Sequence, residues 1–298
     1  DAENNSVFLR VQKWKRLTLR RQIIPSKESF FCHRGIAPIV LKGGLTTSRQ
    51  SVDVMKSKNE RFSYRGLFTC GNIWQCPVCA SKISEKRRSE LNQAIEIADE
   101  KHLTVLHKVL TAPHHLGQNL HDLVGQMCHA KRLMQKRKPW IRLVKMLGLV
   151  GSIRALEVTF SWDNGWHVHF HVLLFLEKAF QPETRKQNLF NLQNMIFEMW
   201  RDACVTAGLK PPSREHGVLI NDHADDYVGK WGSEHEMTKA HIKKGHMGGM
   251  TPFQFLDEYG AGDERFKAIF IEYAKEFKGK KQLVWSRGLR EYLGIDPE

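Results

Sequence analysis

The stretch that decides the fold runs from Ile153 to Leu176 and reads IRALEVTFSWDNGWHVHFHVLLFL. Its two flanks, residues 153–160 and 167–176, are rich in apolar and β-branched side chains. Asp163–Gly165 between them is a strong turn signal, because Asp, Asn and Gly adopt the backbone angles that tight turns need. The stretch therefore predicts a β-hairpin.

The hairpin would bring polar side chains together on one face. A type I turn at Asp163–Gly165, closed by Gly165 in the left-handed conformation, would place Glu157 opposite His171 and diagonal to His169. Side chains alternate along a strand, so His167 lies on that face too. Cross-strand neighbours are about 4.5–5.5 Å apart at Cβ, close enough to share an ion.

Two imidazoles and a carboxylate suit a divalent cation that keeps positions open for a substrate. A single histidine in a strand is more often an ordinary core or surface residue. Three at alternate positions, facing a carboxylate, would leave several buried polar groups without partners unless a ligand were present. We therefore predict a metal site at Glu157, His169 and His171, with His167 as a further imidazole that competes with Glu157 or supports the ligands from behind.

His169-Phe170-His171 resembles the HUH motif (histidine, bulky apolar residue, histidine) of the HUH endonucleases. The wider pattern resembles the rolling-circle replication initiators, the Rep proteins of plasmids, in which a Leu-Glu-Val-Thr-like strand precedes the HUH strand, as Leu156–Thr159 does here. The resemblance runs from about Cys32 to the C-terminus. It implies an HUH-type domain with a central antiparallel sheet, and Mg²⁺ or Mn²⁺ at the predicted metal site.

Residues 223–231, HADDYVGKW, read as the first turns of a helix, in which Tyr227 and Lys230 share a face. A tyrosine hydroxyl, with a pKa of about 10, attacks a phosphate only if cations polarise the phosphate and stabilise the developing charge. Alone, such a pair is typical of any surface helix. The run Tyr-Val-Gly-Lys-Trp at 227–231 is similar to the family's Tyr-x-x-Lys motif, which implies Tyr227 as nucleophile and Lys230 as its cation.

The terminating step is less clear from the sequence. Some initiators carry a glutamate four residues before the tyrosine, which activates water, and this chain has His223 there. The substitutes nearby are Asp225, Asp226, Glu234 and Glu236. The sequence does not choose among them, so the residue that activates water in the terminating step stays open at this point.

Four cysteines precede this core. Cys76-Pro-Val-Cys79 is a spaced pair that can chelate zinc, with Cys70 as third ligand and Cys32 as the best fourth, His33 being the alternative. A single such pair could instead be a redox motif, or the thiols could be free and buried. The segment is similar to the family's Thr-Cys-Gly, Trp and Cys-Pro-x-Cys region. We predict a structural Zn²⁺ site.

The formal net charge is +14 with a pI near 9.6, which favours a polyanionic partner and above all nucleic acid. Two helical-looking stretches, 7–22 and 120–145, are strongly basic. Cations beside an aromatic side chain suit single-stranded or distorted DNA, and the alternative is a solvated helix with one buried tryptophan. The predicted DNA-binding residues are Lys131, Arg132, Lys136, Arg137, Lys138 and Trp140.

The periodicity predicts helices at 81–101, 120–145 and 180–208, strands at 103–111 and 218–220, and helices in the basic tail after residue 239. The fold class is α+β: an antiparallel sheet with the HUH strands central, helices on one face and a zinc-binding N-terminal module. We expect a zinc- and DNA-binding module at 1–100, the nuclease domain at 101–240 and a basic helical extension at 241–298. No signal peptide or membrane span is recognisable, which predicts a cytoplasmic protein.

The resemblance implies site-specific nicking and rejoining of single-stranded DNA through a 5′-phosphotyrosine, with a free 3′-OH that primes replication. The implied partners are origin DNA, a host helicase and a polymerase. One alternative is an HUH transposase, which often carries two tyrosines, whereas only Tyr227 is well placed here. The other is a non-catalytic zinc DNA-binding protein, against which the intact set of Glu, His, Tyr and Lys residues argues.

Overall fold

The computed structural model describes residues 2–40, 44, 46–56, 62–222 and 249–296. The chain divides into two compact units, one of residues 1–83 and 255–274 and one of residues 84–254 and 275–298. These units do not follow the boundaries at 100 and 240, so the division into three functional modules stays a prediction. Among the described residues, no helix is long and apolar enough to cross a membrane.

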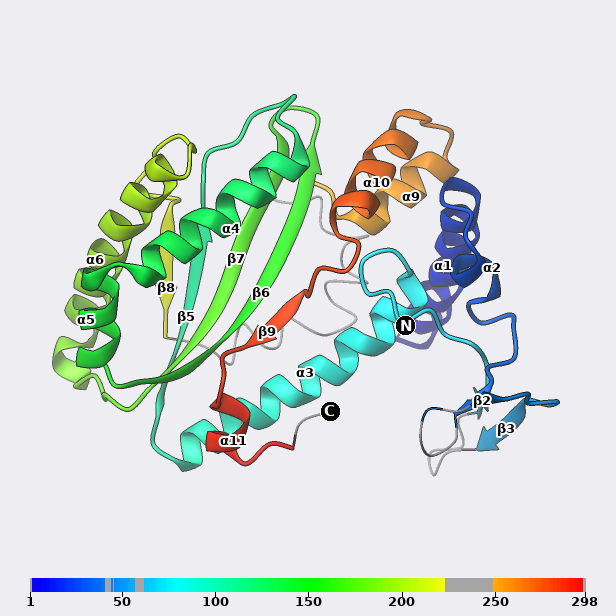
Figure 1. The fold of residues 1–298 in the computed structure, drawn as a ribbon, viewed down its shortest axis with the longest axis horizontal. Helices are drawn as coiled ribbons and strands as arrows, with labels where there is room; N and C mark the ends of the chain where they lie inside the picture. Colours follow the sequence, from blue (N-terminus) through cyan, green and yellow to red (C-terminus); the bar gives the residue numbers. More distant parts are fainter. Residues whose placement is uncertain (1, 41–43, 45, 57–61, 223–248, 297–298) are drawn as a thin grey trace. The chain divides into compact units, whose positions relative to one another are not determined.

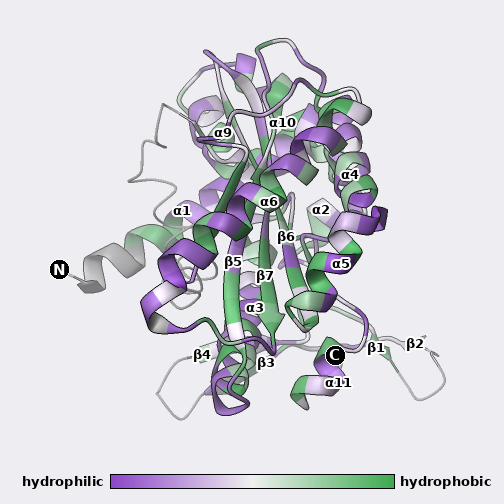
Figure 2. Ribbon diagram, turned by 90° about the vertical axis from the view of Figure 1, so that its left-hand side faces the viewer, coloured by the Kyte–Doolittle hydropathy of each residue, from purple (hydrophilic) through white to green (hydrophobic). Residues whose placement is uncertain are grey.

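The second unit is built on a five-stranded antiparallel sheet of order β8-β5-β7-β6-β9 (Figure 1). Its strands are β5 (Thr104–Thr111), β6 (Leu149–Ser161), β7 (Gly165–Leu176), β8 (Val218–Asn221) and β9 (Leu283–Trp285). The HUH strand β7 is central, as expected, and its end at 172–176 is apolar throughout, which Figure 2 shows in green. The α+β class is confirmed.

The predicted hairpin forms, but its turn lies one residue earlier than predicted, so the predicted register was wrong by two residues. Ser161 pairs with Gly165, so the loop is 162–164 and Glu157 lies opposite His169 rather than His171. The reason is that Gly165, at φ 75°, closes the turn from inside the strand, and the Ser161 hydroxyl accepts a hydrogen bond from the Asn164 N–H at 3.1 Å. A register change of two residues keeps every side chain on its face. The predicted metal ligands therefore still share one face of the sheet.

Helices cover both faces of the sheet, not one. Even-numbered residues of β5–β7 face α4 (Leu120–Lys136), α5 (Lys138–Met146) and α6 (Arg185–Thr206), which follows the short η1 (Pro182–Thr184). On the other face, α3 (Pro77–Glu100) and α11 (Leu289–Leu293) bury Ile153, Leu173 and Phe175 in one apolar cluster. The odd-numbered side chains beyond this cluster, nearer the hairpin loop, are those of the predicted metal site.

Two other expectations were wrong in detail. The single helix expected at 120–145 is broken at Arg137, which is extended (φ −76°, ψ 145°), because Pro139 is tolerated only in the first turn of a helix and α5 starts there. The tail is not all helical, since β9 adds an edge strand beside β6. The strand expected at 103–111 and the helix expected at 180–208 are both present apart from their ends.

The first unit holds α1 (Ala2–Ile23), α2 (Lys27–Phe31), the pairs β1 (Ile39–Val40) with β2 (Thr46–Thr47) and β3 (Asp53–Lys56) with β4 (Phe62–Arg65), and most of α9 (Pro252–Gly260) and α10 (Arg265–Glu276). The basic run of α1 is partly internal. Arg16 is buried and paired with Asp257, and Arg20 is buried and donates to Gln75. These two arginines therefore brace the unit and are not on its surface.

Candidate active site

The predicted metal ligands meet on the odd-numbered face of β6 and β7. The Nε2 atoms of His169 and His171 lie 3.0 and 2.7 Å from the same carboxylate oxygen, Oε2 of Glu157. Each residue offers one ligand atom, and these atoms lie within 4.8 Å of one another. Two imidazoles and a carboxylate that converge in this way could hold a divalent metal ion and leave positions open.

The environment of the three side chains suits a metal. Burial raises the pKa of Glu157, but the charge of His169 and hydrogen bonds with both histidines outweigh it, so the pKa lies well below its ordinary value. Burial lowers the pKa of His171, which favours the neutral ring that binds metals. The Glu157 side chain is 32% exposed, against 14% and 12% for the two histidines, so the carboxylate forms the open side of the cluster.

His107 on β5 is a residue that the sequence analysis missed. Its Nε2 shares a hydrogen bond of 3.1 Å with Nδ1 of His171, and the two rings stack with centroids 5.3 Å apart. A ring nitrogen held in this way fixes the orientation and tautomer of a ligating histidine. The strand at 103–111 was assigned no chemistry. The available signal was an imidazole between two valines, Val105 and Val109, at the odd positions of this strand.

His167 lies one step further along the face. Its ring is 5.0 Å from that of His169 and 4.6 Å from that of His114, which follows β5 and was also missed. Burial lowers the pKa of His167 to about 3, so the ring is neutral. Within the described residues it is not part of the group whose ligand atoms converge, which leaves Glu157 as the better partner of the two HUH histidines.

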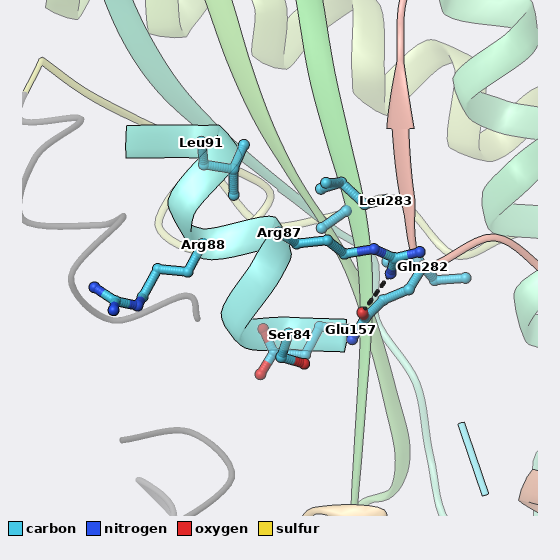
Figure 3. Close-up of a pocket in the computed structure, with 9 residues that line it drawn as sticks. Ser84, Arg87, Arg88, Leu91, Glu157, Gln282 and Leu283 are labelled. Carbon is cyan, nitrogen blue, oxygen red and sulfur yellow. Dashed lines mark hydrogen bonds between the residues drawn. The ribbon is translucent and has the colours of Figure 1, made fainter. Parts of the chain in front are cut away.

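A small pocket opens beside Glu157 (Figure 3). Its walls come from the part of α3 in the second unit, from β6 and from the segment before β9. Arg87 and Glu157 both line this pocket, and Arg87 extends from α3 to donate a hydrogen bond of 3.0 Å to Gln282, whereas Arg88 extends away and pairs with Glu85 (Figure 3). A guanidinium beside the metal carboxylate suits a phosphate oxygen.

The four predicted cysteines come together in the first unit. The Sγ atoms of Cys32 and Cys79 are 3.5 Å apart, those of Cys32 and Cys76 3.8 Å, and those of Cys70 and Cys79 3.7 Å. A tetrahedron with zinc–sulfur bonds of about 2.3 Å has edges of about 3.8 Å, so these spacings fit one metal ion and exceed a disulfide bond of about 2.05 Å. All four thiols are free.

The thiols also share their protons unevenly. Hydrogen bonds with Cys32 and its neighbours lower the pKa of Cys70 and raise that of Cys76. A lowered pKa supplies the thiolate that binds metals. The alternative ligand His33 lies at the rim, with Nε2 3.8 Å from the sulfur of Cys79, and its ring packs against Trp14. The chemistry and spacing of the four sulfurs fit a metal without it.

The six predicted DNA-binding residues of 131–140 do not share one environment in the structure. Arg132, Lys136 and Lys138 are exposed on α4 and α5, whereas Arg137 is half-buried and donates to Thr206. Lys131 and Trp140 turn inward to the sheet, where Trp140 is only 6% exposed. A base could stack on Trp140 only if this packing opened. Contact of the exposed cations with phosphates stays a prediction.

The predicted nucleophile and its cation, Tyr227 and Lys230, lie outside the described residues, as do His223 and the four acidic candidates for water activation. The described flanks of that segment lie on either side of the two strands that carry the candidate metal ligands. Asn221 ends β8 beside β5, and Met250 exchanges hydrogen bonds of 2.8 and 3.0 Å with Phe160 on the outer edge of β6. A role for Tyr227 therefore rests on its sequence motif.

Comparisons with known proteins identify the family of this chain. A family described as "Replication protein" matches residues 66–296. The chain belongs to this family. The match covers three of the four clustered cysteines (Cys70, Cys76 and Cys79), all five strands of the large sheet and both HUH histidines. The plasmid-initiator resemblance that the HUH hairpin carries in the sequence agrees with this membership.

Individual relatives of this replication protein are distant. The chain is 26% identical over 296 residues to "Protein rep" of Streptomyces lividans, covering 78% of this chain and 65% of the relative. It is 32% identical over 108 residues to "Protein rep" of Lentilactobacillus hilgardii, covering 35% and 32%. It is 24% identical over 185 residues to a neomycin resistance protein of Streptomyces cyanogenus, covering 50% and 42%. The chain thus spans less than two thirds of each relative's length, and no solved structure matches it.

Proposed function

We propose that this protein initiates rolling-circle replication by nicking and rejoining single-stranded origin DNA. The observation that carries the proposal is the convergence of Glu157, His169 and His171 on one point of a central hairpin. Membership of the replication protein family supports the same function over a transposase. A non-catalytic DNA-binding protein would have no need to keep three ligands, and His107 behind them, in this arrangement.

In the proposed reaction, the Tyr227 oxygen attacks the scissile phosphorus and loses its proton. The new P–O bond to tyrosine forms as the bond to the 3′ oxygen breaks, which leaves a 5′-phosphotyrosine and, after protonation, a free 3′-OH. A Mg²⁺ or Mn²⁺ ion held by Glu157, His169 and His171 would supply Lewis-acid polarisation of the phosphate. Lys230 steadies the tyrosinate, and Arg87, which lines the same pocket as Glu157, orients a phosphate oxygen.

Trapping of the covalent adduct tests this proposal. Tyr227→Phe removes one oxygen, so we expect folding and DNA affinity to survive while cleavage of labelled single-stranded origin DNA and the adduct both disappear. Chelation of the divalent metal in the unmodified protein should have the same effect. A nucleotide mapped to Tyr64, Tyr259, Tyr273 or Tyr292 would refute the choice of nucleophile.

We also propose that Cys32, Cys70, Cys76 and Cys79 hold a structural Zn²⁺. A closed four-thiolate site commonly contributes directly to folding, and the core of the first unit around Leu17 is packed on these cysteines. Elemental analysis should find about one zinc per chain, and Cys76→Ser should lose it and unfold the first unit. Folded, active and zinc-free protein would disprove the site. His33→Ala should keep its zinc.

A further inference from the structure

A pocket on the opposite face of the five-stranded sheet from the metal ligands is lined by three cationic side chains. Lys108 comes from β5, Arg154 from β6 and Lys131 from α4, and all three surround a cavity of about 210 Å³ between the sheet, α4 and α5. Lys108 and Arg154 stand in one row, because both pair with Val172 on the strand between them. No residue of this pocket belongs to the proposed nicking site.

Among the described residues, no carboxylate lines this pocket or acts on its cations. Lys108 is 2% exposed and its ammonium has no hydrogen-bond partner within the described part of the chain. Burial lowers its pKa to about 7, and burial together with the charge of Arg154 lowers that of Lys131 to about 8. Burial lowers the pKa of Arg154 as well. The pocket is therefore positive and, within the part of the chain that the structure describes, has no carboxylate counter-ion.

Aromatic rings compensate these charges only in part. The Lys108 ammonium lies 4.3 Å from the centre of the Trp140 ring, and the Arg154 guanidinium 5.3 Å from that of Phe170. Such contacts stabilise a cation far less than a charged partner does, and cations buried without an anion are costly. A pocket that gathers several cationic side chains in this way usually binds an anionic ligand.

We propose that this pocket binds a phosphate group. Its volume is many times the roughly 10–15 Å³ that one water needs, so a phosphate fits with solvent. A guanidinium fork and two ammonium groups match phosphate oxygens in number and charge. Trp285 also lines the pocket, and its Nε1 is a buried donor without a partner among the described residues. The phosphate belongs either to a free nucleotide or to a DNA strand that passes this face.

Calorimetric titration in low-salt buffer tests the site with three probes: inorganic phosphate, dAMP and a short single-stranded oligo(dT). We expect the unmodified protein to bind phosphate, and Lys108→Met or Arg154→Met to weaken binding at least about tenfold, since each removes a charge-assisted hydrogen bond. Lys108→Arg should retain binding. If oligo(dT) displaces phosphate from the pocket, the natural source is a DNA strand; if only dAMP does, it is a free nucleotide.

The matched control is Lys101→Met. Lys101 also stands over an aromatic ring, 5.6 Å from that of Tyr292, but it is exposed and outside the pocket, so phosphate binding should not change. Thermal melting separates ligand binding from a structural role. Without phosphate, Lys108→Met should melt at or above the temperature of the unmodified protein, because a buried unpaired charge is gone. No phosphate binding by the unmodified protein, or equal binding by Lys108→Met, would overturn the proposal.

Discussion

The two faces of the five-stranded sheet differ in charge although they are made of the same strands. One face gathers a carboxylate and imidazoles, with Glu157, His169 and His171 converging on one point. The other gathers Lys108, Lys131 and Arg154 without a carboxylate among the described residues. Neighbours in sequence, such as His107 and Lys108, therefore face different candidate sites. Because side chains alternate between the two faces of a strand, one sheet can place the proposed cation site and the proposed anion site back to back.

The largest effect should come from removing a ligand on the metal face. His171→Ala should lower cleavage of labelled origin DNA at least about 100-fold, because the polarising ion contributes several kcal/mol to the transition state. The matched control is Val168→Ala, a truncation on the same strand but on the opposite face. It should destabilise the fold modestly and keep cleavage within a few fold. Equal loss in both variants would mean that strand packing, and not metal, explains the result.

A smaller effect is expected one strand away. His107→Phe keeps an aromatic ring but removes the hydrogen bond to His171, so the metal concentration for half-maximal cleavage should rise about 10–100-fold. His107→Gln, which can still bond, should restore part of the affinity. The direct readout is Mn²⁺ binding by electron paramagnetic resonance. Lys108→Met, the next residue on the other face, should leave Mn²⁺ affinity unchanged, and an equal shift there would break the separation of the faces.

The smallest effect is a pH dependence of stability from the cationic face. Burial lowers the pKa of Lys108 from its ordinary 10.5 to about 7, so between these values the unfolded chain binds more protons than the folded one. The free energy of unfolding should then increase as the pH rises from 7 towards 10.5, by at most about 1.4 kcal/mol per pH unit. It should be lowest at the pH 7 end of this window. Urea unfolding at pH 7 and pH 9 should show the rise in the unmodified protein and lose it in Lys108→Met. If the free energy of unfolding changed equally with pH in both proteins, the prediction for Lys108 would be wrong.

The hairpin shows how much of the candidate site could be predicted from the sequence. The two-residue period alone put Glu157 on the face of His169 and His171, and an error of one residue in the turn could not change that. The break before Pro139 was also readable, since proline is restricted to the first helical turn, but the length of the basic run concealed it. Spacing likewise predicted the cysteine cluster, in which Cys32 joins the others from 38 residues upstream of Cys70.

The sequence by itself determined which residues could bind metal, because ligand type and local spacing are properties of short segments. Only the tertiary structure decided which side chains contact these candidate ligands and which residues gather on the other face of the sheet. His107 reaches His171 because β5 pairs with β7, and Lys131 reaches Lys108 because α4 lies over the even-numbered face. Strand order and helix docking depend on burying apolar surface across the whole unit, and no local pattern contains that sum.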